Sequence, residues 1–367
     1  MSTSFTSIPL VDFSRLDNPE TKQAELAVLR HAVFNVGFLY IVETGLEVRS
    51  IPQHTSPGVV RLIIFWQQSL IKEAHARMPE IFAIPIEEKQ KVSMLNSPAF
   101  LGYTGLGTET TANQTDIREQ FDFGTECPDW SEGDPFWQRV EGPTQFPNDS
   151  VKDLVTRYNT SMTEVGRKFV RYVAECLALP SDTFEPFLGA MSRLKFIKYP
   201  PAAPGSQGVG PHKDIFGFFT FLAQDNVGGL QVLNKSGEWI DATPVEGSIV
   251  VNVAQGFEAV TGGVCSGTTH RVVAPTSTTR YSIPFFQAVR LDLKLEELKR
   301  STAEIVAKIP VSEDKKKRAV DVPSELISPL FECFGEGILR NRIFSHPDVG
   351  EKWYPELVGK YRQQVLV

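Results

Sequence analysis

Hydrophobic residues recur with a helical period in the first half of the chain and with a strand period in the second half. Apolar positions three or four residues apart predict helices over residues 18–36, 70–82 and 151–179. Short apolar runs predict strands at 8–13 and 38–42, and then at 194–199, 218–222, 230–233, 239–242, 248–253, 271–274 and 282–289. Turn residues separate these late runs, which predicts an α+β chain with a double-stranded β-helix (jelly-roll) core.

The same pattern divides the chain into three parts. Residues 1–190 are a helical and strand region, 191–290 the jelly-roll core, and 291–367 a charged helical tail. Residues 48–69 do not fit the predicted elements. They lie between a predicted strand and a predicted helix, and they include an apolar run that has no polar face. Two interpretations stay open for this stretch: a surface insertion, which loops tolerate well, or a translated intron.

Composition narrows the function classes. Hydrophobic residues make up 41% of the 367 positions, which is enough for a large core, and the net charge of −7 disfavours a nucleic-acid partner. No apolar run approaches the roughly 18 residues that span a bilayer, and the N-terminus lacks a secretory pattern. Four scattered cysteines fit neither a zinc site nor a disulfide framework, so we expect a reducing, cytoplasmic setting. The oligomeric state stays open and is compatible with a monomer.

Two histidines and one aspartate form the most informative pattern. His212 and Asp214 are two residues apart, a spacing that places both side chains on one face of a strand, and His270 follows much later. A single His-x-Asp is common in loops and a single His is often structural, so the hypothesis depends on the apolar, strand-like surroundings. Two imidazoles and one carboxylate suit ferrous iron and leave coordination positions open. The pattern therefore predicts an iron site.

A basic residue follows the second histidine at the start of another apolar run. Arg280 and Ser282 share a face of the predicted strand. An arginine offers a planar fork of donors that matches a carboxylate, and a serine hydroxyl adds another donor. The alternative for Arg280 is a surface salt bridge, which the apolar run disfavours.

From about residue 8 to about residue 290, the chain resembles the isopenicillin N synthase-like non-haem iron(II), 2-oxoglutarate-dependent oxygenases. The matching pieces are Ile8–Phe13, Gly37–Ile41, Tyr199–Pro200, His212–Asp214, Gly228–Val232, Thr269–Val272 and Arg280–Ser282. The resemblance implies Fe(II) on His212, Asp214 and His270. It also implies 2-oxoglutarate with its distal carboxylate on Arg280 and Ser282. Tyr199 would assist that carboxylate or, equally, serve as a core aromatic residue.

The activity implied by the resemblance is a dioxygenase reaction that uses O2 and 2-oxoglutarate. Such an enzyme oxidises a small metabolite, most simply by hydroxylation, and releases succinate and CO2. Two alternatives within the fold remain: an oxidase that does not use 2-oxoglutarate, and an ethylene-forming enzyme. A non-enzymatic cupin-like binding module would not need the intact iron triad, which disfavours it.

Substrate recognition is expected from a Gly- and Thr-rich stretch and from aromatic residues. Residues 102–112 resemble the substrate-lining loop of ethylene-forming enzymes, in which Glu109 and Thr111 would hold an arginine, while residues 240–244 resemble fungal nucleobase hydroxylases. For Glu109 the alternative is a solvated loop charge. Apolar walls would exclude water from the oxidation, and the candidates are Phe216, Phe218, Phe257, Phe285 and Phe286, each of which could instead be ordinary core.

Overall fold

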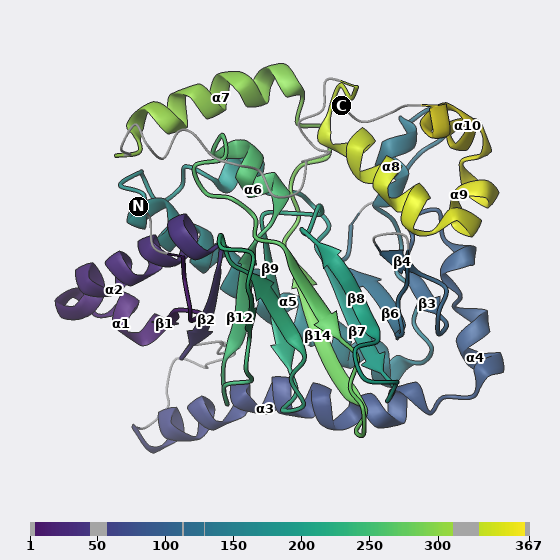
Figure 1. The fold of residues 1–367 in the computed structure, drawn as a ribbon, viewed down its shortest axis with the longest axis horizontal. Coiled ribbons are helices and arrows are strands. Elements are labelled where there is room, and N and C mark those ends of the chain that lie inside the picture. Colours follow the sequence, from purple (N-terminus) through teal and green to yellow (C-terminus); the bar gives the residue numbers. More distant parts are fainter. Residues whose placement is uncertain (1–3, 45–56, 112–113, 128, 311–329, 364–367) are drawn as a thin grey trace.

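The computed structural model describes residues 4–44, 57–111, 114–127, 129–310 and 330–363. Two β-sheets lie at the centre of this part of the chain (Figure 1). The larger has the strand order β1-β2-β12-β9-β14-β7-β6-β3, and the smaller has the order β11-β10-β13-β8. The α+β jelly-roll prediction is thereby confirmed.

The larger sheet joins strands from both halves of the chain. Its members are β1 (Leu10–Asp12), β2 (Phe38–Val42), β3 (Gly102–Thr104), β6 (Glu119–Gly124), β7 (Arg193–Tyr199), β9 (Phe219–Gln224), β12 (Ile249–Val253) and β14 (Arg280–Phe286). The smaller sheet comprises β8 (Gln207–His212), β10 (Leu230–Leu233), β11 (Trp239–Asp241) and β13 (His270–Val273). A separate hairpin pairs β4 (Thr110–Thr111) with β5 (Gln114–Thr115).

Helices cover the outside of the larger sheet and its edges. They are α1 (Phe13–Asp17), α2 (Pro19–His31), α3 (Pro57–Phe82), α4 (Ile86–Lys91), α5 (Asp149–Cys176), α6 (Gln255–Val260), α7 (Leu295–Lys308), α8 (Phe334–Ser345), α9 (Pro347–Trp353) and α10 (Pro355–Gln363). In Figure 1, α1 and α2 flank one side of the sheets, while α8–α10 lie on the other side. Asn18 caps α2 by accepting a hydrogen bond from the backbone N–H of Glu20. None of the described helices is long and apolar enough to cross a bilayer.

Strand alternation separates a helix-facing core from a space between the sheets. On β14, Tyr281, Ile283 and Phe285 contact the helix-side core, whereas Arg280, Ser282, Pro284 and Phe286 line a cavity on the opposite face. A second apolar cluster, which includes Phe38, Tyr40, Tyr199, Val209, Val232 and Val272, brings together side chains of both sheets. The cavity therefore lies on a rigid, well-packed frame.

Most predicted elements occur with shifted ends. The helix predicted over 18–36 consists of α2 and a π-helical turn at Ala32–Val36, which ends at Gly37 with a φ of 74°. Strands β3, β4, β5 and β6 were not predicted, and in the region of β8 a strand was expected only at His212 and Asp214. Within the anomalous stretch, residues 48–56 lie outside the described residues and 57–69 belong to α3, so the insertion and intron interpretations both stay open. The division of the chain at residues 190 and 290 also stays an interpretation.

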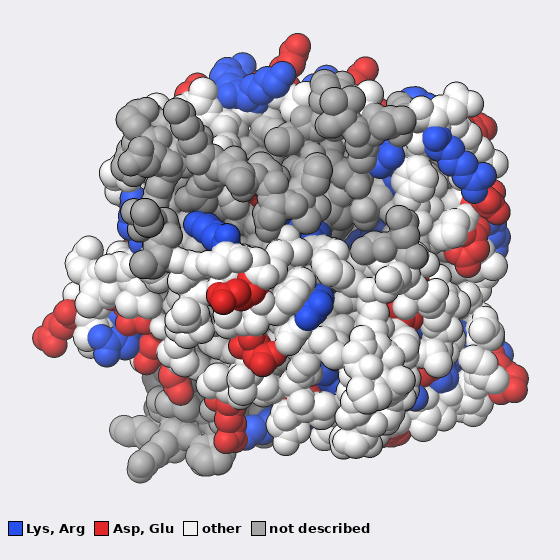
Figure 2. Space-filling model, in the orientation of Figure 1, with Lys and Arg blue, Asp and Glu red and all other residues white. Residues whose placement is uncertain are grey.

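Charged side chains are mixed on the visible surface. On the face shown in Figure 2, Lys and Arg residues lie among Asp and Glu residues and do not merge into one basic area within the described part.

Candidate iron and co-substrate site

Pairing of β8 with β13 brings the two histidines together. His212 ends β8 and stands opposite His270, the first residue of β13. The expectation that His212 and Asp214 share a strand is wrong, because β8 ends at His212 and Asp214 lies in the following loop. The backbone N–H of Gln255 donates to the Asp214 carbonyl at 2.9 Å, which holds that loop against the start of α6.

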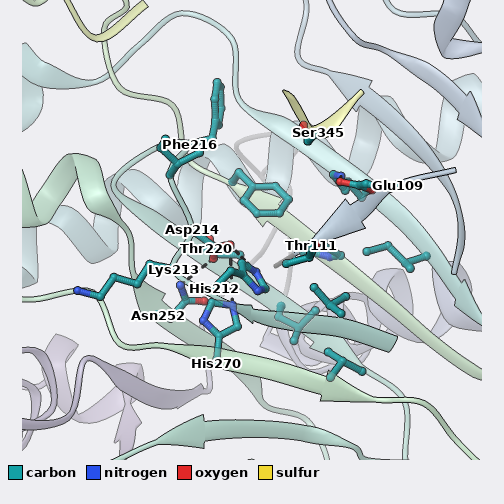
Figure 3. Close-up of a pocket in the computed structure, with 18 of the residues that line it drawn as sticks. Glu109, Thr111, His212, Lys213, Asp214, Phe216, Thr220, Asn252, His270 and Ser345 are labelled. Atoms are coloured by element: carbon teal, nitrogen blue, oxygen red, sulfur yellow. Dashed lines mark hydrogen bonds and ion pairs between the residues drawn. The ribbon is translucent and has the colours of Figure 1, made fainter. Parts of the chain in front are cut away.

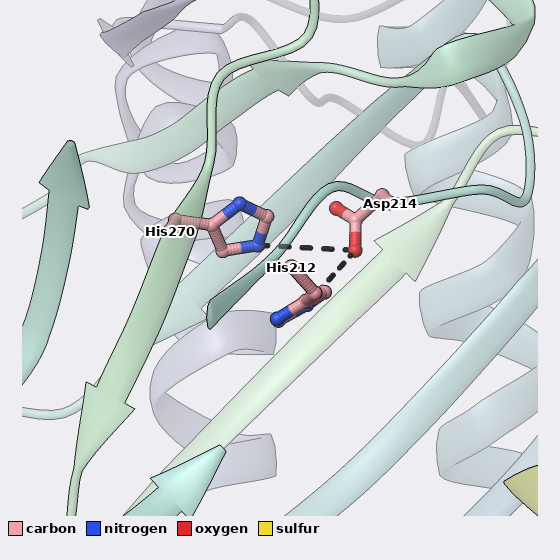
Figure 4. Close-up of side chains that lie close together, drawn as sticks. All are labelled: His212, Asp214 and His270. Atoms are coloured by element: carbon pink, nitrogen blue, oxygen red, sulfur yellow. Dashed lines mark ion pairs between the residues drawn. The ribbon is translucent and has the colours of Figure 1, made fainter. Parts of the chain in front are cut away.

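The three candidate ligands converge on one point (Figure 4). Asp214 Oδ1 lies 3.5 Å from His212 Nε2 and 3.8 Å from His270 Nε2. One ligand atom from each residue lies within 4.8 Å of the others. This spacing suits three donors arranged around one metal ion.

Backbone carbonyls orient both imidazoles. His212 Nδ1 lies 2.8 Å from the Gly210 carbonyl oxygen, and His270 Nδ1 lies 3.1 Å from the Thr268 carbonyl oxygen. A carbonyl can only accept, so Nδ1 carries the proton in each ring and Nε2 is left with a free lone pair. Both free nitrogens face the Asp214 carboxylate, which is the arrangement a metal requires.

Two side-chain donors hold the Asp214 carboxylate. Asp214 Oδ2 accepts hydrogen bonds from Thr220 Oγ1 at 2.6 Å and from Asn252 Nδ2 at 2.8 Å. The other oxygen, Oδ1, is thereby directed toward the histidines (Figure 4). Neither Thr220 nor Asn252 was singled out from the sequence, although each is a polar residue within an apolar strand.

Electrostatics favour an ionised Asp214 carboxylate beside a neutral His270. Burial raises the Asp214 pKa, but the nearby histidines and the Thr220 hydroxyl hold that pKa well below its usual range. Burial, helped by the neighbouring His212, lowers the pKa of His270 to about 4. For His212, burial acts downward, yet Asp214 raises the pKa overall. A carboxylate and two imidazole lone pairs are the donor set of ferrous oxygenases.

Arg280 is buried in the cavity wall beside this cluster. Its side chain is 0% exposed, and all three guanidinium nitrogens lack a hydrogen-bond partner among the described residues. The guanidinium lies 4.8 Å from the centre of the Tyr199 ring, which stands opposite it on β7. Ser282, two residues on, is also buried and lines the same cavity. A buried, unpartnered fork of donors fits a carboxylate-bearing co-substrate such as 2-oxoglutarate.

The cavity is about 770 Å³ in volume and is lined by all the residues predicted to contact iron or 2-oxoglutarate, and by Glu109 and Thr111. Figure 3 shows Glu109 and Phe216 on different walls of the cavity, with Thr111 between Glu109 and the histidines in this view. Phe286 also lines the cavity, whereas Phe218, Phe257 and Phe285 pack in the core. Three of the five aromatic candidates are therefore core residues.

Glu109 is not a solvated loop charge. Its side chain is 10% exposed, and its Oε2 pairs with Arg118 at 2.8 Å and accepts a hydrogen bond from Gln120 at 2.7 Å. Thr111 donates to Asp116 at 2.7 Å, which closes the β4–β5 hairpin over the cavity. The stretch is thus an ordered wall whose acidic residue already has a partner within the protein.

Helix α8 supplies cavity residues that the sequence did not reveal. Arg340, Asn341, Arg342, Phe344 and Ser345 line the cavity from this helix. Ser345 lies beside Glu109 in Figure 3, and the next residue, His346, has its Nε2 3.9 Å from Glu109 Oε1. Only the general charged character of the tail was visible in the sequence.

Comparison with known proteins identifies the family. Residues 8–149 match the family described as the N-terminal region of the non-haem dioxygenase in morphine synthesis, and residues 189–288 match the 2OG-Fe(II) oxygenase superfamily. The chain belongs to this superfamily and is a 2-oxoglutarate-dependent dioxygenase, which uses Fe(II), 2-oxoglutarate and O2.

Curated relatives align with most of this chain. The 2-oxoglutarate-dependent dioxygenase frbJ of Dothideomycetidae sp. (strain 11243) is 38% identical, covering 98% of this chain and 96% of its own. A homoarginine-6-hydroxylase of Arabidopsis thaliana is 30% identical, covering 81% of this chain and 89% of its own.

Solved structures share the fold. A 2OG-Fe(II) oxygenase family protein from Caulobacter crescentus aligns with a TM-score of 0.64 at 24% identity, covering 92% of this chain and 98% of its own. The Arabidopsis thaliana dioxygenase for auxin oxidation 1, in a complex with 2-oxoglutarate, aligns with a TM-score of 0.57 at 20% identity. The alignment covers 78% of this chain and 94% of the Arabidopsis chain. At these identities the likeness concerns the fold alone.

Proposed function

We propose that His212, Asp214 and His270 hold the ferrous ion and that the enzyme hydroxylates a small molecule bound in the adjoining cavity. The two histidines offer neutral Nε2 donors, and Asp214 offers Oδ1 because Thr220 and Asn252 engage its other oxygen. Three protein donors leave coordination positions for a co-substrate and for dioxygen.

The observation that carries this proposal is the Arg280 guanidinium. It is fully buried, faces the same cavity as the ligands, and has three nitrogens without hydrogen-bond partners among the described residues. Arg280 would anchor the distal carboxylate of 2-oxoglutarate, with Ser282 as a further donor and the Tyr199 ring packed against the guanidinium. When bound, iron and 2-oxoglutarate together supply the oxidising chemistry, with release of succinate and CO2.

The protein itself positions the reactants and excludes water. Phe216 and Phe286 give the cavity apolar walls that separate the reacting centre from solvent. All residues proposed to contact iron or 2-oxoglutarate fall within 191–290, which supports that segment as the catalytic core. No disulfide joins the four cysteines, all of which lie among the described residues, and this suits a reducing, cytoplasmic setting that keeps iron ferrous.

For the substrate, we propose a small molecule whose cationic or donor group approaches Glu109. Oε2 of this carboxylate is occupied, but Oε1 lies 4.0 Å from Lys195 and 3.9 Å from His346, beyond hydrogen-bonding distance. Relatives named homoarginine-6-hydroxylase act on a molecule with such cationic groups, which supports this assignment.

Stoichiometry tests the proposed function. Purified protein is incubated with Fe(II), O2 and 2-oxoglutarate, and succinate is measured while a metabolite extract is screened for compounds that raise its release. We expect a hydroxylated product, with one oxygen atom added per coupled succinate. Substrate oxidation without 2-oxoglutarate consumption would instead support an oxidase of the same fold.

A further inference from the structure

Positive charge exceeds negative charge on the cavity wall around Glu109. Burial raises the pKa of this carboxylate, but Arg118, Lys195, His346 and Arg342 together hold that pKa well below the usual range. The three cations Arg118, Lys195 and Arg342 line the cavity. Burying several charges together is unfavourable unless each has a partner, so the partners of each cation matter.

Two of the three cations have carboxylate partners in the protein. Arg118 pairs with Glu109 at 2.8 Å and with Asp116 at 3.0 Å. Lys195 pairs with Asp122 at 3.3 Å and is 4.0 Å from Glu109. These contacts satisfy both cations.

Arg342 is the third cation, and it differs from the other two. It lies on α8 and is 9% exposed, yet no hydrogen bond or ion pair of its guanidinium occurs among the described residues. Its charge also lowers the pKa of the buried Arg193 and Lys195, in each case after the larger effect of burial. A largely buried cation beside other cations is unfavourable unless something compensates it. Arg342 lines the cavity, so a ligand bound there can reach its guanidinium.

We propose that Arg342 binds a carboxylate of the primary substrate, while the neighbouring Glu109 Oε1 accepts from an ammonium or guanidinium group of the same molecule. This inference rests on the proposed function and specifies its substrate class as an amino acid or a close derivative. A guanidinium fork binds carboxylate and phosphate alike. Arg342 is the one of these three cations without a carboxylate partner among the described residues, and one such cation suits the single charge of a carboxylate better than the greater charge of a phosphate. Helix α8 would then form part of the substrate site.

Binding to the anaerobic complex with Fe(II) and 2-oxoglutarate tests the inference. The probes are the twenty protein amino acids and L-homoarginine, the corresponding amines without the carboxylate, and inorganic phosphate. Each is titrated while the visible absorption of the iron complex and the melting temperature are recorded. We expect at least one amino acid to bind, its amine to bind more weakly, and phosphate to have no effect at the same concentration.

The variant Arg342→Met supplies the decisive comparison. Losing a buried charge partner should weaken the binding of that amino acid about tenfold or more, and should leave binding of the amine unchanged. Arg342→Lys should recover part of the affinity. A structural cation would lower the melting temperature when removed, whereas loss of an uncompensated cation should leave it unchanged or higher. Arg362→Met, which removes an exposed arginine of α10 that pairs with Glu351 of α9, is the matched control.

The outcomes separate this inference from the proposed function. If no amino acid binds to the wild type, or if Arg342→Met binds it equally well, the inference is overturned while iron binding and uncoupled succinate release persist. If the wild type forms no complex with Fe(II) and 2-oxoglutarate, the proposed function fails and the inference falls with it.

Discussion

Lys213 Nζ lies 3.3 Å from Glu258 Oε2, and the same carboxylate oxygen accepts a hydrogen bond from the backbone N–H of Gly267 at 2.8 Å. Lys213 stands between two proposed iron ligands, and Gly267 precedes the third by three residues. Glu258 belongs to α6, so this helix connects both ligand-bearing segments. The ligand geometry therefore depends on a buried carboxylate that does not contact the metal position.

Glu258→Ala should destabilise the fold and loosen the iron site. Removing this acceptor leaves the buried Gly267 N–H without its partner and takes a carboxylate from Lys213, which should lower the free energy of unfolding by about 3 kcal/mol or more. Chemical denaturation of the iron-free protein measures this. Glu246→Ala, which removes a 90% exposed side chain of an exposed ion pair, should change stability little. Equal effects in both variants would contradict the connecting role.

Thr220→Val and Asn252→Ala should each weaken iron binding. Both side chains donate to Asp214 Oδ2, and loss of such a contact typically lowers metal affinity about 10–100-fold. Anaerobic Fe(II) titration provides the measurement. Thr163→Val is the control, because it also removes a threonine hydroxyl hydrogen bond, here to the Asn159 carbonyl within α5, and Thr163 does not line the cavity. Wild-type affinity in both Thr220→Val and Asn252→Ala would show that Asp214 needs no such orientation.

Arg280→Lys should raise the KM for 2-oxoglutarate with iron binding retained. Lysine keeps the charge but loses the planar fork, and one lost charge-assisted hydrogen bond corresponds to about tenfold or more. Steady-state succinate release as a function of 2-oxoglutarate measures the effect. Arg290→Lys, at a partly exposed surface pair with Asp292, serves as the comparison. An unaltered dependence on 2-oxoglutarate in Arg280→Lys would remove Arg280 as the anchor.

Glu109→Ala should uncouple substrate oxidation from 2-oxoglutarate turnover. The variant loses the acceptor proposed for the substrate, whereas the iron ligands and Arg280 are untouched. Because Glu109 also pairs with Arg118, we expect a loss of stability of about 3–5 kcal/mol, so coupling must be measured well below the melting temperature. Product formed per succinate gives the coupling. The same ratio in variant and wild type would show that Glu109 does not recognise the substrate.

The sequence predicted those site residues that form recognisable short motifs. A His-x-Asp pair, a later histidine and an Arg-x-Ser pair in an apolar strand are unusual enough to be recognised, and strand alternation places Arg280 and Ser282 on one face. Polar residues inside apolar strands, Thr220 and Asn252, were a signal that went unused.

Other parts depend on tertiary contacts that a sequence does not show. Asp214 leaves the strand because the loop after β8 turns to hydrogen-bond with α6, and no spacing rule anticipates that. Glu109 looked isolated because its partner Arg118 becomes a neighbour only when the β4–β5 hairpin closes. The tail was predicted as a charged helix, but only the fold brings Arg342 to the cavity.

Anaerobic titration of wild type and His270→Ala with Fe(II) in the presence of 2-oxoglutarate tests the central assignment most directly. The wild type should bind iron tightly and develop the visible metal-to-ligand absorption expected of chelated 2-oxoglutarate. His270→Ala should lose both while its circular dichroism stays that of the folded protein, because one of three metal donors is gone. Unchanged iron affinity and absorption in His270→Ala would contradict the assignment of His212, Asp214 and His270 as the iron site.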